Sequence, residues 1–372
     1  MPAKRVLFLL DCLYQGAGGG SERQFLKLYR HAAEIGIDPY VAFLRTEAVH
    51  RQLDWARPPL QLQLKSLRSP ALPLVLWRLK RLVSRERIEV LHTLFDDATL
   101  CGGLLKALCP GLRLICSQRN LGHAHSGLRK RLLGAVFRRG EQVVVNARVI
   151  AHMLEAEYGV APQRTRVIPN MYEAAPAARP GGADLHALRR RHGMLAVVVA
   201  NLRPVKGIDD LLAAARQTAD LDLGYVLIGD GGGLASYRRE VAAAGLQARV
   251  HLLGARDDVP AWLAMADLAI LPSRSEGMSN ALVEYMFAGL PIVATRVGGN
   301  VEALDGGRCG VLVAPRSPAG LAAGIRALVD DPPRRARLGR CAHRYAEGRY
   351  TVSRVSAAYR RLYRCGPAGS PR

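Results

Sequence analysis

Two glutamates in one short segment are the residues of this sequence that are best suited to chemistry. Glu276 lies in a polar loop, and Glu284 is the only charged residue of the apolar stretch that follows. They stand eight positions apart, more than two helical turns, so they do not form an i,i+4 pair on a helix surface. A carboxylate on an apolar helix is costly unless something binds it. Glu284 therefore either pairs with a nearby arginine, such as Arg274 or Arg296, or binds a ligand.

The elements around these glutamates are expected to be a strand, a loop, a helix and a second strand. An apolar strand at 268–271 ends at a proline, and a compact apolar helix is predicted over 281–288. Ser279 or Asn280 can cap the start of this helix, and a glycine and a proline follow its end. A fully buried strand is predicted over 291–295.

The segment EGMSNALVE, followed by AGLPIVAT, closely resembles the E-x7-E signature of glycosyltransferase family 4. That family consists of retaining, nucleotide-sugar-dependent enzymes with the GT-B fold. The resemblance implies that Glu276 contacts the hydroxyls of the donor sugar and that Glu284 binds the ribose of the nucleotide. Backbone N–H groups at the start of the helix would add an anion site for the donor. The residues concerned are Gly277, Met278, Ser279 and Asn280.

A glycine-rich turn lies near the beginning of the chain, between a strand predicted over 5–10 and a helix predicted over 22–35. Strand, glycine-rich turn and helix form the layout of a phosphate cradle. The spacing matches neither common phosphate-binding motif, so the motif alone leaves a flexible turn as the alternative. In family 4 a loop at this place lets the backbone approach the donor diphosphate and the acceptor. The resemblance gives this role to Gly18, Gly19 and Gly20.

Two cations in the segment NLRPVKG resemble the Arg/Lys pair with which the family grips the donor diphosphate: Arg203 and Lys206. A lysine at a helix start opposes the helix dipole, so a bound anion is favoured there over a lysine that simply faces solvent. The family binds the nucleobase near the backbone at Gly254, and Arg256 is assigned to the donor site with it.

The acceptor side is less patterned. Many family members have a histidine after the strand that corresponds to 112–117, and here Gln118 and Arg119 occupy that place. Arg119 either binds a phosphate or is a surface arginine. Asn120 and His123 are the other acceptor-side candidates.

The fold class predicted for this chain of 372 residues is α/β, because strand-like and helix-like segments alternate through both halves. By resemblance, two Rossmann-like domains face each other across a deep cleft. We expect an N-terminal acceptor-binding domain at 1–173 and a linker at 174–184. A nucleotide-sugar-binding domain would follow at 185–345, and a C-terminal helix with a short tail at 346–372 would pack back on the first domain.

The net charge of +22 raises the question of an anionic partner. No nucleic-acid motif is present and few aromatic residues interleave with the basic ones, so an anionic membrane surface is favoured over nucleic acid. Residues 126–140 combine five basic residues with one apolar stripe, as in a helix that lies on a membrane. An ordinary domain helix with a solvated basic face is an equal alternative. The stripe consists of Leu128, Leu132, Leu133, Val136 and Phe137.

Seven cysteines, an odd number without a C-x-x-C motif, predict reduced thiols and neither a disulfide framework nor a zinc site. The D-x-D match at 220–222 is expected in a surface turn, so we predict no metal and no cofactor besides the nucleotide sugar. The first ten residues indicate a strand rather than a signal peptide, and no apolar run is long enough to span a membrane. A cytoplasmic protein, peripheral on the inner face of the membrane, is expected.

The predicted function is retaining transfer of a sugar, of the hexosyltransferase type, to a glycan or lipid-linked acceptor in cell-surface polysaccharide or glycolipid biosynthesis. Lys206, Arg203 and the helix start at 279–281 would stabilise the leaving diphosphate. A glycoside hydrolase with Glu276 and Glu284 as acid and base would leave the phosphate-type loops without a purpose. Two more hypotheses compete with sugar transfer: a nucleotide-sugar epimerase or phosphorylase on the same fold, and a non-catalytic membrane-surface binding protein.

Overall fold

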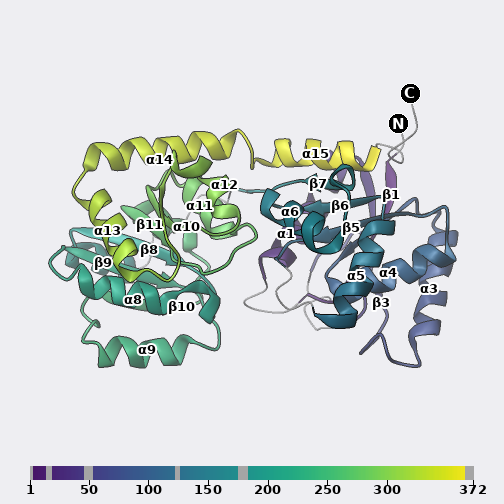
Figure 1. Cartoon of the computed structure of the whole chain (residues 1–372), viewed down its shortest axis with the longest axis horizontal. Helices are drawn as coiled ribbons and strands as arrows, with labels where there is room; N and C mark the ends of the chain where they lie inside the picture. The colour runs from purple at the N-terminus through teal and green to yellow at the C-terminus, as the bar shows by residue number, and fades with distance from the viewer. Residues whose placement is uncertain (1–2, 14–18, 46–52, 122–125, 175–182, 365–372) are drawn as a thin grey trace. The chain divides into compact units, whose positions relative to one another are not determined.

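The computed structural model describes residues 3–13, 19–45, 53–121, 126–174 and 183–364. The chain divides into two compact units (Figure 1). Unit 1 comprises residues 1–171 with 352–372, and unit 2 comprises residues 172–351. Unit 1 therefore ends two residues before the expected boundary, and the chain returns to it six residues later than expected. Most of the predicted linker at 174–184 lies outside the described residues.

Unit 1 is built on a parallel sheet of seven strands in the order β3-β2-β1-β4-β5-β6-β7. The strands are β1 (Lys4–Leu10), β2 (Ile37–Phe43), β3 (Leu60–Gln61), β4 (Val90–Leu94), β5 (Arg113–Gln118), β6 (Gln142–Val145) and β7 (Thr165–Val167). The helices are α1 (Gly20–Arg30), α2 (Ala32–Ile35), α3 (Leu72–Arg85), α4 (Asp96–Leu108), α5 (Gly127–Arg139), α6 (Arg148–Tyr158) and α15 (Val352–Arg364), with a 3₁₀ turn η2 (Pro162–Arg164).

Alternating side chains of the central strands supply two cores, one on each face of this sheet. Leu7 and Leu9 of β1 pack with α3, α4, α5 and α6. Phe8 and Leu10 point the other way and pack with α1, α2 and α15. Both faces are covered, which is why β1 is apolar and buried from Val6 to Leu10.

Unit 2 repeats the plan with a parallel sheet of six strands in the order β10-β9-β8-β11-β12-β13. The strands are β8 (Met194–Val199), β9 (Leu223–Ile228), β10 (Val250–Gly254), β11 (Leu268–Leu271), β12 (Ile292–Thr295) and β13 (Val311–Val313). The helices are α7 (Ala183–Arg191), α8 (Ile208–Gln217), α9 (Leu234–Ala243), α10 (Val259–Met265), α11 (Asn280–Phe287), α12 (Gly299–Ala303), α13 (Pro318–Val329) and α14 (Pro332–Glu347), with 3₁₀ turns η3 (Pro204–Lys206) and η4 (Asp305–Gly307).

The strand order reverses once in each sheet, between β1 and β4 in unit 1 and between β8 and β11 in unit 2. Ligands of doubly wound sheets bind outside the carboxyl ends of the strands at such a reversal. The prediction of two Rossmann-like domains is confirmed, and the reversals mark where each unit would hold a ligand.

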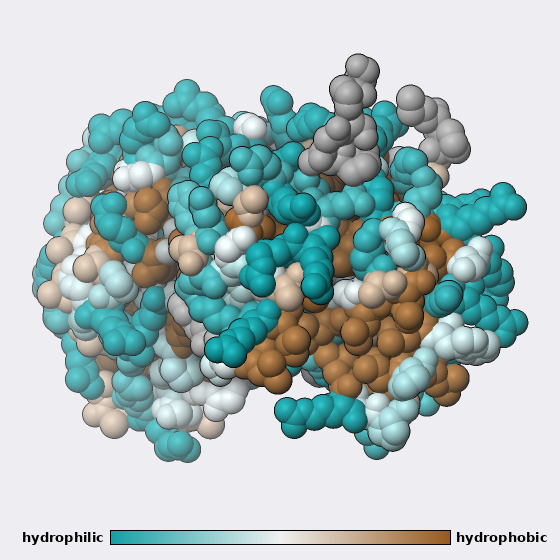
Figure 2. Space-filling model, turned by 45° about the vertical axis from the view of Figure 1, so that its right-hand side comes forward, coloured by the Kyte–Doolittle hydropathy of each residue, from teal (hydrophilic) through white to brown (hydrophobic). Residues whose placement is uncertain are grey.

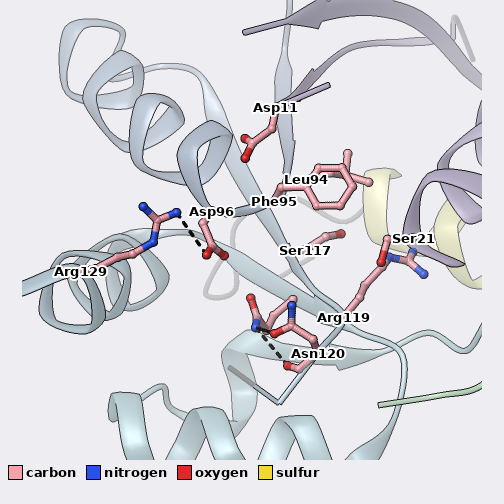
Figure 3. Close-up of a pocket in the computed structure, with 10 residues that line it drawn as sticks. Asp11, Ser21, Leu94, Phe95, Asp96, Ser117, Arg119, Asn120 and Arg129 are labelled. Atoms are coloured by element: carbon pink, nitrogen blue, oxygen red, sulfur yellow. Dashed lines mark hydrogen bonds and ion pairs between the residues drawn. The ribbon is translucent and has the colours of Figure 1, made fainter. Parts of the chain in front are cut away.

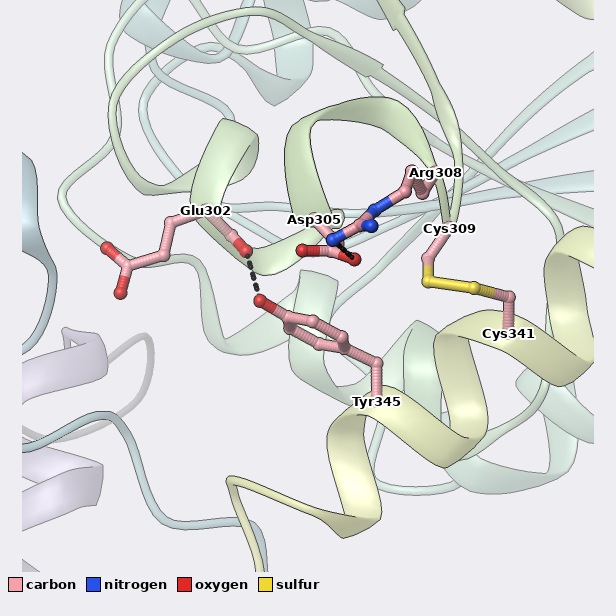
Figure 4. The surroundings of a disulfide bond; sticks show 6 residues. All are labelled: Glu302, Asp305, Arg308, Cys309, Cys341 and Tyr345. Carbon is pink, nitrogen blue, oxygen red and sulfur yellow. Dashed lines mark hydrogen bonds and ion pairs between the residues drawn. A yellow bond between two sulfur atoms is a disulfide. The ribbon is translucent and has the colours of Figure 1, made fainter.

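The cysteine prediction is wrong at one pair. Cys309, just before β13, forms a disulfide with Cys341 of α14. An odd number of cysteines does not exclude one disulfide, and the fold packs α14 beside the loop that contains Cys309 (Figure 4). Cys101 and Cys116 are free and buried, as the prediction of reduced thiols expects. Burial raises the pKa of Cys101 and of Cys116 to about 12.

Helix α5 does not present the apolar stripe of residues 126–140 as one surface. Leu133 and Phe137 are buried in the core of unit 1, whereas Leu128 and Leu132 are exposed. Most of the stripe therefore serves the domain core, and its exposed part is limited to the first half of the helix. Across the described ranges, no helix has the length and hydropathy needed to cross a bilayer.

Candidate active site

Glu276 and Lys206 form an ion pair at the carboxyl edge of the unit 2 sheet. The Lys206 ammonium donates to Glu276 Oε1 at 2.6 Å, and the Ser273 hydroxyl donates to the same oxygen at 2.7 Å. The Glu276 side chain is only 9% exposed and that of Lys206 is 21% exposed. Charge-assisted hydrogen bonds in such a sheltered place are strong and hold both groups in a fixed geometry. The structure thus joins two residues to which the sequence assigned separate parts of the donor.

Two glycines let the loops around this pair approach at the level of the backbone. Gly207, at φ +64°, directly follows Lys206, and a Cβ there would lie 2.2 Å from the carbonyl oxygen of Pro272. Gly298, at φ +46°, would place a Cβ 1.6 Å from the carbonyl oxygen of Glu276. Only glycine fits both the space and the backbone conformation. These contacts fix the loops after β8 and β12 against the loop that carries Glu276.

Helix α11 begins immediately after this loop. Its N-cap is Ser279, whose hydroxyl accepts a hydrogen bond from the Leu282 N–H at 3.4 Å. Met278 and Ser279 are buried. The predicted segment Gly277–Asn280 therefore leads into a helix N-terminus beside Glu276, a position where backbone N–H groups favour an anion.

Glu284 lies further along α11 and is half-buried. Burial and, after it, the charge of the Glu284 carboxylate raise the pKa of the Tyr172 phenol. Arg274, one of the two arginines expected to neutralise Glu284, binds Asp210 at 3.1 Å and also binds Asp209. That arginine is committed to α8, which weakens the interpretation of Glu284 as its ion-pair partner.

The remaining donor candidates of unit 2 take no part in the Lys206–Glu276 ion pair. Arg203 is exposed at the N-cap of η3. Gly254 ends β10 at φ +74°. Arg256 pairs with Asp258 at 2.8 Å and with Asp184 at 3.0 Å, so its guanidinium already has structural partners.

Unit 1 contains a cavity of about 220 Å³ at the carboxyl ends of β1, β4 and β5, at the reversal of strand order (Figure 3). It is lined by Asp11, Ser21, Leu94, Phe95, Asp96, Ser117, Gln118, Arg119, Asn120 and Arg129. The sequence predicted a site role for Arg119 and Asn120 but not for Asp11 or Arg129. Asp11 could have been found, since it is the first charged residue after the apolar run of β1.

The structure describes only the last part of the glycine-rich turn. Gly18 and His123 lie outside the described residues. Gly19 is the N-cap of α1 and Gly20 is its first residue, directly before the cavity-lining Ser21. The start of α1 therefore borders the cavity.

Arg119 carries a positive charge that no carboxylate balances among the described residues. Its Nη1 donates to Asn170 Oδ1 at 3.1 Å, and its Nη2 donates to the Tyr359 hydroxyl at 2.9 Å. Both acceptors are neutral, and the buried Nε makes no hydrogen bond within the described structure. Two contacts fix this guanidinium, and its uncompensated charge prepares it to bind an anionic ligand.

The opposite wall of the cavity is acidic but internally paired. Asp11 accepts from the Ala98 N–H at 2.6 Å, and burial raises the pKa of its carboxyl to about 6. The Arg129 Nη2 donates to Asp96 Oδ2 at 3.2 Å and to Asp97 Oδ1 at 3.0 Å. This wall offers carboxylate oxygens to hydroxyl groups of a ligand.

His92 does not reach the cavity. It is completely buried, with Nδ1 2.6 Å from the Tyr363 hydroxyl and Nε2 2.8 Å from the Ser117 hydroxyl. Burial, together with the charge of Arg119, lowers the pKa of His92 to about 3, so the ring is neutral. Its role is to hold Ser117, a lining residue, against α15.

Two Rossmann-like units, each with a candidate ligand site at the carboxyl edge of its sheet, define a protein of the GT-B class. Family models described as Glycosyltransferase Family 4 and as Glycosyl transferases group 1 match residues 18–175 and 194–331, respectively. The chain belongs to glycosyltransferase family 4.

A solved structure shares the fold, and two curated relatives share part of the sequence. The Anabaena protein HepE, solved in complex with UDP-glucose, has the same fold, with a TM-score of 0.80 and 21% identity over 96% of this chain and 98% of that one. D-inositol 3-phosphate glycosyltransferase 1 of Catenulispora acidiphila is 33% identical over 247 residues, 61% of this chain and 58% of that protein. The N-acetyl-alpha-D-glucosaminyl L-malate synthase of Bacillus anthracis is 28% identical over 186 residues, 48% of this chain and 49% of that protein. The chain thus spans about half the length of these curated relatives.

Proposed function

We propose that this chain transfers a sugar, with retention of configuration, from a nucleotide-sugar donor to a hydroxyl group of an acceptor. The observation that carries the proposal is the 2.6 Å pair between Lys206 and Glu276 beside the N-terminus of α11. Family membership gives these residues a donor-binding context. UDP-glucose in the HepE structure supports a nucleotide sugar as the kind of donor.

The pair suits the two ends of a donor. Both hydrogen bonds of the Glu276 carboxylate fall on Oε1, so Oε2 is available to accept from a sugar hydroxyl. The Lys206 ammonium has donors to spare for a phosphate oxygen. Lys206, the N–H groups at the start of α11 and the exposed Arg203 would stabilise the charge that develops on the leaving diphosphate.

In the reaction, the bond between the sugar C1 and the diphosphate oxygen breaks while the acceptor oxygen forms its bond to C1 on the same face. The proton of the acceptor hydroxyl passes to the leaving phosphate, which removes the need for a protein nucleophile. Glu284 would accept hydrogen bonds from the ribose hydroxyls and so hold the nucleotide while the sugar is transferred.

We assign the acceptor to the cavity of unit 1. Arg119 favours an anionic group, and the carboxylates of Asp11 and Asp96 and the amides of Gln118 and Asn120 favour hydroxyls. The acceptor would therefore be a glycan or lipid-linked compound that carries a phosphate or carboxylate beside its hydroxyls. The names of two relatives, which refer to inositol 3-phosphate and to malate, support acceptors of this chemistry.

No metal is needed in this scheme. Asp220, the first residue of the D-x-D match, is held by Arg326 at 2.6 Å, and this hydrogen bond lowers the pKa of its carboxyl to about 2. Its role is to fix a turn to α13. We therefore propose that transfer continues in the presence of a chelator.

We also propose that the protein works in the cytoplasm, peripherally on the inner face of the membrane, in cell-surface polysaccharide or glycolipid biosynthesis. The support is the net charge of +22, which an anionic lipid surface would attract.

The test is a screen of UDP-, GDP- and ADP-sugars for hydrolysis and for thermal stabilisation of the protein, with and without a chelator. Proton NMR of the product then gives the anomeric configuration. One donor series should both stabilise the protein and turn over with retention. Inversion, or formation of an epimer without release of the nucleotide, would overturn the proposal in favour of another activity of this fold.

A further inference from the structure

Large exposed hydrophobic side chains gather on three neighbouring helices of unit 1. Six of the eight in the described part of the chain belong to α3, α4 and α5, which pack side by side on one face of the sheet. Figure 2, in which this side of the molecule is turned forward, shows an apolar patch there. The six are Leu74, Trp77, Leu104, Leu108, Leu128 and Leu132. We call this surface the α3–α5 face.

The charges on α3 and α5 are of one sign. Helices α3 and α5 carry nine basic residues and no acidic one. The two acidic residues of α4 lie in its first turn, where Arg129 binds both. Lys80, Arg131 and Arg139 are exposed and make no ion pair within the described residues. A surface that joins apolar side chains with unpaired cations matches an anionic, partly apolar partner.

Trp77 suggests what that partner is. The indole is 55% exposed on α3, and the Arg81 guanidinium lies 5.5 Å from the centre of its ring. Tryptophan beside cations is typical of side chains at the boundary between lipid headgroups and acyl chains. The long stems of lysine and arginine can lie along the acyl region while their charged ends reach the phosphates.

We propose that the α3–α5 face docks on an anionic lipid bilayer, with Leu74, Trp77 and the exposed leucines of α4 and α5 in the interfacial layer. The proposal names the surface through which the protein would bind the membrane peripherally. It rests on the proposed function in one respect, since docking would bring the protein to a lipid-linked acceptor. A second copy of the chain is disfavoured, because a symmetric contact would bring the same positive surface against itself. An acidic protein partner is an outcome that the test must separate.

The experiment measures co-sedimentation of the full chain with two kinds of vesicle, neutral phosphatidylcholine and phosphatidylcholine with roughly one third phosphatidylglycerol. Binding should require the anionic lipid and should fall as salt is raised. The Leu74→Gln/Trp77→Gln variant and the Lys80→Glu/Arg131→Glu variant should each lose at least about tenfold in affinity, the first through lost apolar contact and the second through reversed charge.

Matched controls come from other faces of unit 1. Val167→Gln removes an exposed hydrophobic residue of β7, and Arg354→Glu/Arg361→Glu reverses two exposed charges of α15. Each should change vesicle binding by less than about twofold, because surface charges far from the bilayer are screened. Brominated lipid should quench tryptophan fluorescence in the parent, and the Trp77→Phe variant should lose most of that quenching.

Three results would overturn the proposal: no binding to anionic vesicles, equal losses in the α15 control, or binding without quenching of Trp77. The first would leave an acidic protein as the partner of this face. Donor hydrolysis, measured without vesicles, separates this proposal from the catalytic one. The α3–α5 variants should keep parental hydrolysis, and a parent that binds vesicles but releases no nucleotide would sink only the catalytic assignment.

Discussion

Lys206 and Glu276 lie 70 residues apart in the sequence, yet their side chains meet at 2.6 Å. The contact exists because β8, which leads to Lys206, and β11, which leads to Glu276, are neighbours in the sheet at its reversal of strand order. The cation that we propose for the diphosphate and the carboxylate that we propose for the sugar are thereby fixed side by side. Such preorganised charges are what a transfer reaction with an anionic leaving group requires.

Replacing Glu276 with glutamine should reduce sugar transfer by at least about 100-fold, because a neutral amide is a weaker partner for the sugar hydroxyls and for Lys206. The amide oxygen can still accept from Lys206 and Ser273, so the free energy of unfolding should change by less than about 2 kcal/mol. Initial rates and denaturant unfolding measure the two effects. A variant that turns over within a few-fold of the parent would remove Glu276 from the reaction.

Lys206→Ala should weaken binding of both the nucleotide sugar and the free nucleoside diphosphate by about 10- to 100-fold, the usual worth of a hydrogen bond to a charged group. Titration calorimetry with both ligands is the measurement. Arg203→Ala serves as the comparison and should have a smaller effect, since Arg203 is exposed and lies outside the ion pair. Equal diphosphate affinity in the parent and the Lys206 variant would end the assignment.

The two Rossmann-like domains were predictable from the sequence, whereas the contacts between distant residues were not. Strands covered on both faces bury apolar side chains on both, so the buried part of β1 and the strands β8 and β11 stand out in the sequence as short apolar runs. Which loops meet depends on the order of strands in the sheet, and this order is not encoded in any one segment. For that reason the Lys206–Glu276 pair was not predicted.

The sequence also did not predict how α5 is rotated about its axis relative to the core. The spacing of apolar residues in α5 identified the stripe, but spacing alone does not say which part faces the core. Leu133 and Phe137 face inward and Leu128 and Leu132 face outward. The same limit applies to Cys309 and Cys341, since only the packing of α14 brings them together.

The Arg119→Gln substitution should raise the KM for an anionic acceptor by about 10- to 100-fold, since a charge-assisted contact is lost, and should leave donor affinity unchanged. An inositol monophosphate is the first probe, followed by whichever anionic acceptor a screen identifies. Tyr359→Phe removes one of the two contacts that hold the guanidinium, so it should show a weaker effect of the same kind. Equal effects of Arg119→Gln on donor and acceptor would indicate a structural role instead.

Asp11 should make the stability of unit 1 depend on pH. Burial raises the pKa of its carboxyl to about 6 in the folded protein, against an ordinary value of 3.8, so ionisation disfavours the folded state. The parent should therefore lose stability relative to Asp11→Asn as the pH rises from about 4 to 7, by up to about 3 kcal/mol. Urea unfolding of both proteins across this range measures the difference. A parallel pH dependence of the two would show that burial does not raise this pKa.

The Glu284→Gln substitution separates ligand binding from structural pairing. Arg274 is bound by Asp209 and Asp210, so we expect Glu284 to act on the ribose rather than as the partner of that arginine. Arg296, the other arginine expected beside Glu284, is exposed. If Glu284 acts on the ribose, loss of its charge should change the stability of the ligand-free protein by no more than about 1 kcal/mol, because neither arginine would become an unpaired buried cation. The amide is a poorer acceptor for two ribose hydroxyls, so saturating nucleotide should stabilise the variant less than the parent.

The matched control for this test is Asp210→Asn, which breaks the observed pair with Arg274. Asp210 is largely buried but Arg274 keeps its contact with Asp209, so this variant should lose roughly 2 kcal/mol of stability without ligand while its nucleotide affinity changes little. Denaturant unfolding of the three proteins, with and without nucleotide, separates the two effects. If Glu284→Gln behaves like Asp210→Asn, with a large loss in the ligand-free protein and unchanged nucleotide affinity, then Glu284 is a structural residue. The opposite pattern would tie the second glutamate of the signature to the nucleotide, as its place on α11 leads us to expect.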